Sequence, residues 1–255
     1  MSKRLAALLL CLAVTPAFAG TGSTRVLLVG DSTMAPETGY GDALCARFVP
    51  EVTCVNLAKG GRSTSSYRAE GSWQRVQTLL QDGANFATTY VLVQFGHNDQ
   101  PGKPGRSTDL ATEFPANMAR YAKEIRELHA VPVLVTPLAR RTFKNGQLDN
   151  DLRPWAEATL KVAANEHVAA LDLNADSVAA VQAMGQEQAD TLAMAPPPAN
   201  PESATPAAGK GNGNGYRGFD RTHLGAKGAA LFADMVAAEL RHAVPALEAY
   251  IKVQP

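Results

Sequence analysis

Five short aliphatic runs alternate with segments of helical periodicity, and this alternation constrains the fold of the chain more than any other feature. The runs are RVLLVG (25–30), VTCVNL (52–57), YVLVQFG (90–96), VPVLVTP (131–137) and VAALDL (168–173). Apolar residues recur at helical spacing near 40–49, 72–82, 114–129, 151–166 and 175–189. Because a helix between two strands permits parallel pairing, we predict an α/β fold with a mostly parallel sheet of about five strands.

The composition of the runs indicates how the sheet is covered. They are continuously apolar instead of alternating between apolar and polar residues, which is typical of strands buried on both faces. We therefore predict a three-layer α/β/α sandwich, with helices on both faces of the sheet. Ligand sites in such sheets form beyond the carboxyl ends of the strands, so the functional residues are expected there.

The first 19 residues have the features of a signal peptide. Lys3 and Arg4 precede an apolar run over 5–14, and Ala17-Phe18-Ala19 offers a cleavage site after Ala19. The run is too short to cross a bilayer as a helix, and no later stretch is long and apolar enough to do so. We expect a protein exported to the periplasm or the medium, without a membrane anchor.

Residues 20–255 are expected to form a single domain. The stretch 195–218 is rich in Pro and Gly, and we interpret it as a surface loop because the 37 residues after it provide one helix and a tail, too little for a second core. Lys plus Arg equals Asp plus Glu at 24 each, so the bulk charge does not favour nucleic acid as a partner. We expect a monomer.

Two cysteines remain after removal of the signal peptide, Cys45 and Cys54, nine positions apart. In an oxidising compartment this pair is able to form a disulfide, and the alternative is two buried thiols that behave as small hydrophobic residues. The sequence does not give the Cα separation that decides between the two.

Polar clusters follow three of the predicted strands: GDST (30–33), NLAKGGRS (56–63) and GHND (96–99). At one edge of a parallel sheet they would bring together a hydroxyl, the amides of glycine-rich turns and an Asn side chain, which are a nucleophile and donors for an oxyanion. A fourth cluster, DRTH (220–223), offers a carboxylate and an imidazole three residues apart. Taken alone, Ser32 is more typical of a turn residue, but the four clusters together favour a nucleophile.

These four blocks resemble those of the SGNH, or GDSL-type, hydrolases, whose fold is a flavodoxin-like sandwich. Within that superfamily the chain is most similar to the rhamnogalacturonan acetylesterases. The shared features are the GDSTM opening, a GRS segment followed by Ser66-Tyr67 and Glu70-Gly71, the FGHND block and the D-x-T-H ending. Met34 stands where the G-x-S-x-G elbow of the α/β-hydrolases would have its second glycine, so that other serine-esterase design is absent.

The resemblance implies a role for each residue of the site. Ser32 would be the nucleophile, His223 the general base and then acid, and Asp220 the group that orients His223. The oxyanion hole would combine the backbone amides of Ser32 and Gly61 with the side-chain amide of Asn98. Gly60 competes with Gly61 for the loop position, but the GRS segment aligns Gly61 with the glycine of the family.

The resemblance also implies a function and a substrate. The chain would be an exported serine esterase that removes acetyl groups from an acetylated polysaccharide or oligosaccharide, here rhamnogalacturonan. Arg62, Arg68 and Arg106 would suit galacturonate carboxylates, although Arg62 and Arg68 serve equally well as braces of their loop. His97 would line the substrate or be structural. The alternatives are an esterase acting on acetylxylan or on small esters, and a non-catalytic carbohydrate-binding protein.

Two further expectations concern aromatic residues and metals. Trp73 and Tyr67 either stack on sugar rings or pack beneath their loop. The histidines show neither H-E-x-x-H nor Cys/His ligand spacing, so we predict no metal and no cofactor.

Overall fold

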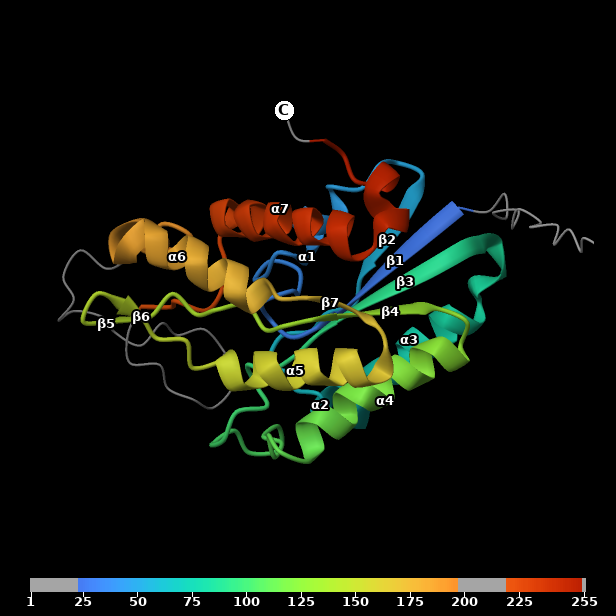
Figure 1. Cartoon of the computed structure of the whole chain (residues 1–255), viewed down its shortest axis with the longest axis horizontal. Coiled ribbons are helices and arrows are strands. Elements are labelled where there is room, and N and C mark those ends of the chain that lie inside the picture. Colours follow the sequence, from blue (N-terminus) through green and yellow to red (C-terminus); the bar gives the residue numbers. More distant parts are fainter. Residues whose placement is uncertain (1–22, 197–218, 254–255) are drawn as a thin grey trace, which may run out of the picture.

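A five-stranded parallel sheet forms the centre of the protein, in the order β2-β1-β3-β4-β7 (Figure 1). The computed structural model describes residues 23–196 and 219–253, so the predicted signal peptide and nearly all of the Pro- and Gly-rich stretch lie outside the described residues. The strands are β1 (Ser23–Gly30), β2 (Val52–Asn56), β3 (Phe86–Gln94), β4 (Val131–Val135) and β7 (Ala169–Leu171). The predicted α/β class and strand number are confirmed.

Helices cover both faces of this sheet (Figure 1). One face carries α1 (Gly41–Cys45), α6 (Leu173–Asp190) and α7 (Ala226–Ala243); the other carries α2 (Ser66–Ala69), α3 (Ser72–Gln81), α4 (Glu113–Glu127) and α5 (Arg153–Glu166). The chain runs from β1 outward to β2, and then back past β1 to β3, β4 and β7. Because crossovers between parallel strands are right-handed, this reversal moves the connecting helices from the face of α1 to the face of α3, α4 and α5.

Successive residues of β1 divide the hydrophobic core between the two faces. Val26 and Leu28 pack with α1, α6 and α7, whereas Leu27 and Val29 pack with α3, α4 and α5, and all four side chains are fully buried. The burial of both sets explains why the run is continuously aliphatic, and it confirms the predicted third layer.

Small elements that the sequence analysis did not predict complete the fold. β5 (Phe143–Lys144) and β6 (Gln147–Leu148) form an antiparallel hairpin through Asn145-Gly146, where both residues have positive φ, as a type I′ turn requires. Among the described residues, the 3-10 helix η1 (Gly83–Asn85) precedes β3, and the 3-10 helix η3 (Pro245–Tyr250) follows α7. None of the helices that the structure describes combines the length and apolar character needed to cross a bilayer.

Candidate active site

Three polar side chains from distant parts of the sequence meet at the carboxyl edge of the sheet. Ser32 leaves the sheet two residues after β1, whereas Asp220 and His223 lie just before α7. The Oγ atom of Ser32 is 2.8 Å from Nε2 of His223, and Nδ1 of His223 is 2.8 Å from Oδ2 of Asp220. The structure thus brings the predicted serine, histidine and aspartate into one hydrogen-bonded line.

Asp220 fixes the orientation of His223. Its second oxygen, Oδ1, accepts hydrogen bonds from the backbone amides of Thr222 (2.9 Å) and His223 (3.1 Å). Burial would raise the pKa of Asp220, but the hydrogen bonds from the His223 ring and from these amides outweigh it and hold that pKa well below its usual range. The ionised carboxylate favours the tautomer with the proton on Nδ1, which leaves Nε2 free to accept the Ser32 proton.

Arg141 anchors the same segment through hydrogen bonds to its backbone. Its side chain is fully buried, and its guanidinium donates to the carbonyl oxygens of His223 (2.7 Å) and Thr222 (3.3 Å). Its backbone amide donates to the carbonyl oxygen of Arg221 (3.0 Å). The sequence analysis missed Arg141, because the segment after β4 carries no recognisable motif and only the fold brings this residue into contact with residues 221–223.

Each of the three groups expected to form the oxyanion hole has a hydrogen-bond donor that is not used within the described part of the chain. Within the described part of the chain, the backbone amides of Ser32 and Gly61 donate to no acceptor. Gly61 has φ 77°, a conformation that favours glycine. Nδ2 of Asn98 donates one of its two hydrogens to the carbonyl oxygen of Arg62 (3.0 Å). This bond fixes the side-chain amide and leaves the second hydrogen for a ligand.

Two buried aspartates hold the turns that carry these donors. Oδ1 of Asp31 accepts from the backbone amide (2.9 Å) and the hydroxyl (2.8 Å) of Thr33, directly after Ser32. Asp99 accepts from the backbone amide and hydroxyl of Thr64 and from the hydroxyl of Thr108, so it joins the loops that follow β2 and β3. Burial raises the pKa of Asp99 to about 6, although the hydrogen bonds from Thr64 and Thr108 act in the opposite direction.

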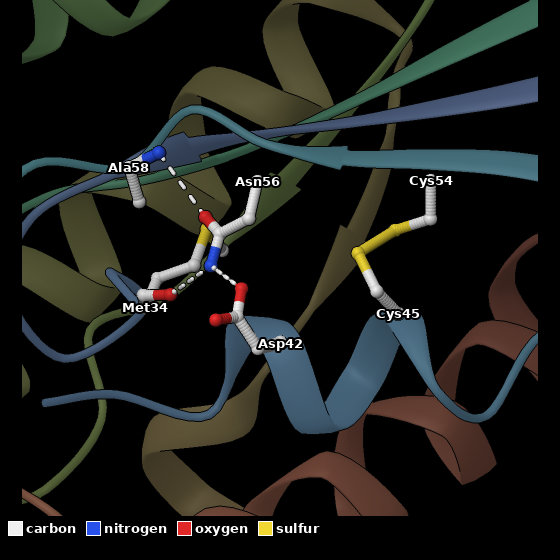
Figure 2. The surroundings of a disulfide bond; sticks show 6 residues. All are labelled: Met34, Asp42, Cys45, Cys54, Asn56 and Ala58. Atoms are coloured by element: carbon white, nitrogen blue, oxygen red, sulfur yellow. Dashed lines mark hydrogen bonds between the residues drawn. A yellow bond between two sulfur atoms is a disulfide. The ribbon is translucent and has the colours of Figure 1, made fainter. Parts of the chain in front are cut away.

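Asn56, at the end of β2, links three further pieces of the site (Figure 2). Its Nδ2 donates to the carbonyl oxygen of Met34 (3.0 Å) and to Oδ1 of Asp42 (2.7 Å), and its Oδ1 accepts from the backbone amide of Ala58 (3.1 Å). Met34 belongs to the turn of Ser32, and Ala58 to the loop that leads to Gly61. One side chain therefore connects the turn of Ser32 to the loop that leads to Gly61.

A disulfide reinforces this connection. Cys45, at the end of α1, is bonded to Cys54 in β2, with a Cα separation of 5.3 Å (Figure 2). The bond lies on the same α1–β2 contact that the Asn56 side chain spans, so the structure decides the alternative that the sequence left open in favour of a bridge.

Two of the three arginines expected to contact substrate, Arg62 and Arg68, are engaged in ion pairs with glutamates. Arg62 donates to Oε2 of Glu70 through Nε (2.8 Å) and Nη2 (2.6 Å). Arg68 donates to both oxygens of Glu124 at 3.1 Å, and its guanidinium lies 4.0 Å from the Tyr121 ring centre. Burial would raise the pKa of Glu70, but hydrogen bonds from Arg62, Ser72 and Lys59 lower it to about 2. The contacts of both arginines are those of braces.

The aromatic and histidine residues singled out in the sequence are buried. Tyr67 is 1% exposed and donates to the carbonyl oxygen of Leu57, and Trp73 is 3% exposed and packs edge-on against Tyr121. Both therefore pack beneath their loop. His97 is also 3% exposed, with Nδ1 3.3 Å from Oδ2 of Asp31 under the Ser32 turn, a place that favours the structural alternative. Burial lowers the pKa of the His97 imidazole.

The arrangement has the parts needed for acyl transfer. A serine hydroxyl lies within hydrogen-bonding distance of an imidazole, and the imidazole is oriented by a carboxylate. Among the described residues, no group of three or more His, Cys, Asp or Glu side chains is arranged to hold a metal ion.

Comparison with known proteins gives consistent matches. The model of the GDSL-like lipase/acylhydrolase family matches residues 18–231. Among curated proteins, the Bacillus subtilis protein named probable rhamnogalacturonan acetylesterase YesY is 30% identical over 91% of this chain and 95% of its own length. The B. subtilis rhamnogalacturonan acetylesterase RhgT is 35% identical over 66% of this chain and 72% of its own length.

Solved structures support the same fold. Protein YxiM of B. subtilis has a TM-score of 0.66 at 22% identity, and the match covers 87% of this chain and 57% of that one. An acetylxylan esterase from Geobacillus stearothermophilus has a TM-score of 0.57 at 17% identity, covering 88% of this chain and 96% of the esterase. At these identities the likeness concerns the fold.

Proposed function

The chain belongs to the GDSL-like lipase/acylhydrolase family and is an esterase of the SGNH superfamily, and from this premise we propose that it removes acetyl groups from rhamnogalacturonan. The observation that carries the proposal is the line from Ser32 Oγ through His223 to Asp220, with 2.8 Å at each step. The named activity of the curated relatives supports the acetylated pectic substrate. The proposal includes export through the segment 1–19.

The proposed reaction proceeds in two halves. Ser32 Oγ attacks the carbonyl carbon of the acetyl ester while His223 Nε2 takes the serine proton, and the negative charge that forms on the carbonyl oxygen is held by the amides of Ser32, Gly61 and Asn98. The C–O bond to the sugar then breaks, and His223 gives its proton to the departing sugar oxygen. Water, deprotonated by His223, attacks the acetyl-serine, and acetate leaves as Ser32 recovers its proton.

The ionisation of Asp220 supports this cycle. Its carboxylate stabilises the imidazolium that forms on His223 in each half of the reaction, and the backbone amides of Thr222 and His223 keep the carboxylate from turning away. Arg141 donates hydrogen bonds to the carbonyl oxygens of the same residues.

The test measures acetate released from acetylated rhamnogalacturonan by the wild type and by Ser32→Ala. We expect release by the wild type and only background release by the variant, with the two proteins equal in circular dichroism and melting temperature. Substantial release by Ser32→Ala would refute the assigned nucleophile. Acetylated xylan is assayed in parallel, because faster release from that polymer would instead favour the acetylxylan alternative.

A further inference from the structure

Two cations that follow Asn98 along the chain have no carboxylate partner within the described residues, unlike neighbouring cations. Lys103 and Arg106 lie between β3 and α4, on the segment that follows Asn98. In residues 23–196 and 219–253 neither side chain forms an ion pair, whereas Arg62 and Lys59 pair with Glu70 and Arg68 with Glu124.

The local backbone fixes where these two residues lie. The amides of Arg106 (3.0 Å) and Ser107 (2.9 Å) donate to the carbonyl oxygen of Lys103, and the Ser107 hydroxyl accepts from the Lys103 amide (2.9 Å). The turn needs positive φ at Gly102 (81°) and Gly105 (71°). Both cations are therefore presented by one closed turn.

Arg106 reaches the oxyanion hole directly. Its Nη1 is 3.4 Å from the carbonyl oxygen of Gly61 and 3.4 Å from Oδ1 of Asn98. Both contacts are long, and both acceptors are neutral, so the guanidinium keeps donors for a stronger acceptor.

Lys103 is partly buried. Burial, together with the charges of Arg140 and Arg106, lowers the pKa of Lys103 to about 8, and the charges of Asp31 and Asp151 oppose this shift. Arg140 is 6% exposed and pairs with Asp151, and its Nε has no hydrogen-bond partner among the described residues.

We propose that Lys103 and Arg106 form a subsite that binds a substrate carboxylate beside the ester being hydrolysed, so that the enzyme recognises a uronic acid unit. The inference rests on the proposed function and adds to it the residues that recognise the negative charge of the polymer. Arg62 and Arg68 are excluded from this role by their ion pairs with Glu70 and Glu124.

The experiment compares two forms of one substrate. Acetylated rhamnogalacturonan oligosaccharides are used with free carboxylates and after conversion of the carboxyl groups to methyl esters, and kcat/KM for acetate release is measured on both. We expect the wild type to prefer the charged form by about ten- to a hundredfold, the range for one or two charge-assisted hydrogen bonds. Lys103→Met should reduce this preference at least fivefold, and Lys103→Arg should restore most of it.

Lys59→Met is the matched control, because it removes a cation from the neighbouring loop that already has a carboxylate partner. Its preference should equal that of the wild type. Equal rates of the wild type on the two forms, or an undiminished preference in Lys103→Met, would overturn the subsite. Absence of acetate release from both forms by the wild type would overturn the proposed function and the subsite with it.

Discussion

Replacement of Asn56 by alanine tests whether one side chain outside the Ser32–His223–Asp220 line keeps the turn of Ser32 and the loop of Gly61 in place relative to each other. Asn56 contacts Met34, Asp42 and Ala58 (Figure 2). None of these contacts involves Ser32, His223 or Asp220, so a loss of turnover would come from displacement of the turns and not from removal of a reacting group.

The magnitude follows from the burial of the three partners. Asp42 is exposed, so its hydrogen bond adds little. The bonds to the Met34 carbonyl and from the Ala58 amide are inside the protein and contribute about 1 kcal/mol each. The Met34 carbonyl keeps a second bond from Gly41 (3.1 Å), whereas no described acceptor replaces Asn56 for the Ala58 amide. The sum is about 2 kcal/mol, which lowers the melting temperature by about 4–8 °C in a protein of this size.

The effect on activity should fall on kcat. A misplacement of about 1 Å costs roughly a hundredfold in rate, so we expect kcat of Asn56→Ala to fall at least tenfold while KM stays within about twofold. The assays are thermal unfolding and steady-state hydrolysis of p-nitrophenyl acetate. Asp42→Ala serves as the control, because it removes only the exposed bond and should change stability by less than about 0.5 kcal/mol. Asn56→Ala with wild-type kcat and melting temperature would refute the reasoning.

Three more predictions follow from the same structure. Asn98→Ala should lower kcat about a hundred- to a thousandfold with an unchanged circular dichroism spectrum, because it removes one oxyanion donor; near-normal turnover would contradict the placement of the hole. The raised pKa of Asp99, about 6 against about 4 in the unfolded chain, means that the folded state binds its proton more tightly. Its contribution to stability is therefore greatest below pH 4 and declines as the pH rises through 6, by up to about 3 kcal/mol. Urea unfolding at pH 4 and pH 7 should show the stability of Asp99→Asn rising relative to the wild type at pH 7, and a difference independent of pH would contradict this. The double variant Cys45→Ala/Cys54→Ala should lose about 2–3 kcal/mol of stability, the chain-entropy value for a closed loop of about ten residues. An unchanged midpoint of urea unfolding would contradict this prediction.

The strands and their ends were predictable because the information is local. The continuous apolar run from Val26 to Val29 already indicates burial on both faces, and GDST, GHND and the Gly61 loop each follow a strand directly. The strand order β2-β1-β3-β4-β7 was not predictable, since it depends on pairing between distant segments whose aliphatic patterns are alike. The hairpin through Asn145-Gly146 carried a recognisable turn signal that the sequence analysis overlooked.

The supporting residues of the site were harder to find than the reacting ones. Arg141 is separated by 82 positions from His223, whose carbonyl it binds, and Arg68 by 56 positions from Glu124. Whether a cation supports a loop or faces a ligand depends on which carboxylate the fold brings near it. Sequence spacing contains no such information.

The pairing state of a cation also decides how much it adds to substrate binding. For Arg62 to bind a substrate carboxylate, it must give up two hydrogen bonds to Glu70, whose pKa of about 2 shows how strongly the ionised form is held, and it gains contacts of the same kind in return. The net gain is close to zero. Among the residues that the structure describes, Lys103 and Arg106 have no such pair to break, and a closed turn holds them, so their contacts with an anion need less rearrangement. We therefore expect Lys103 and Arg106, which form no ion pair in the described part of the chain, to convert substrate charge into selectivity, although Arg62 and Arg68 are the arginines that the motif makes conspicuous.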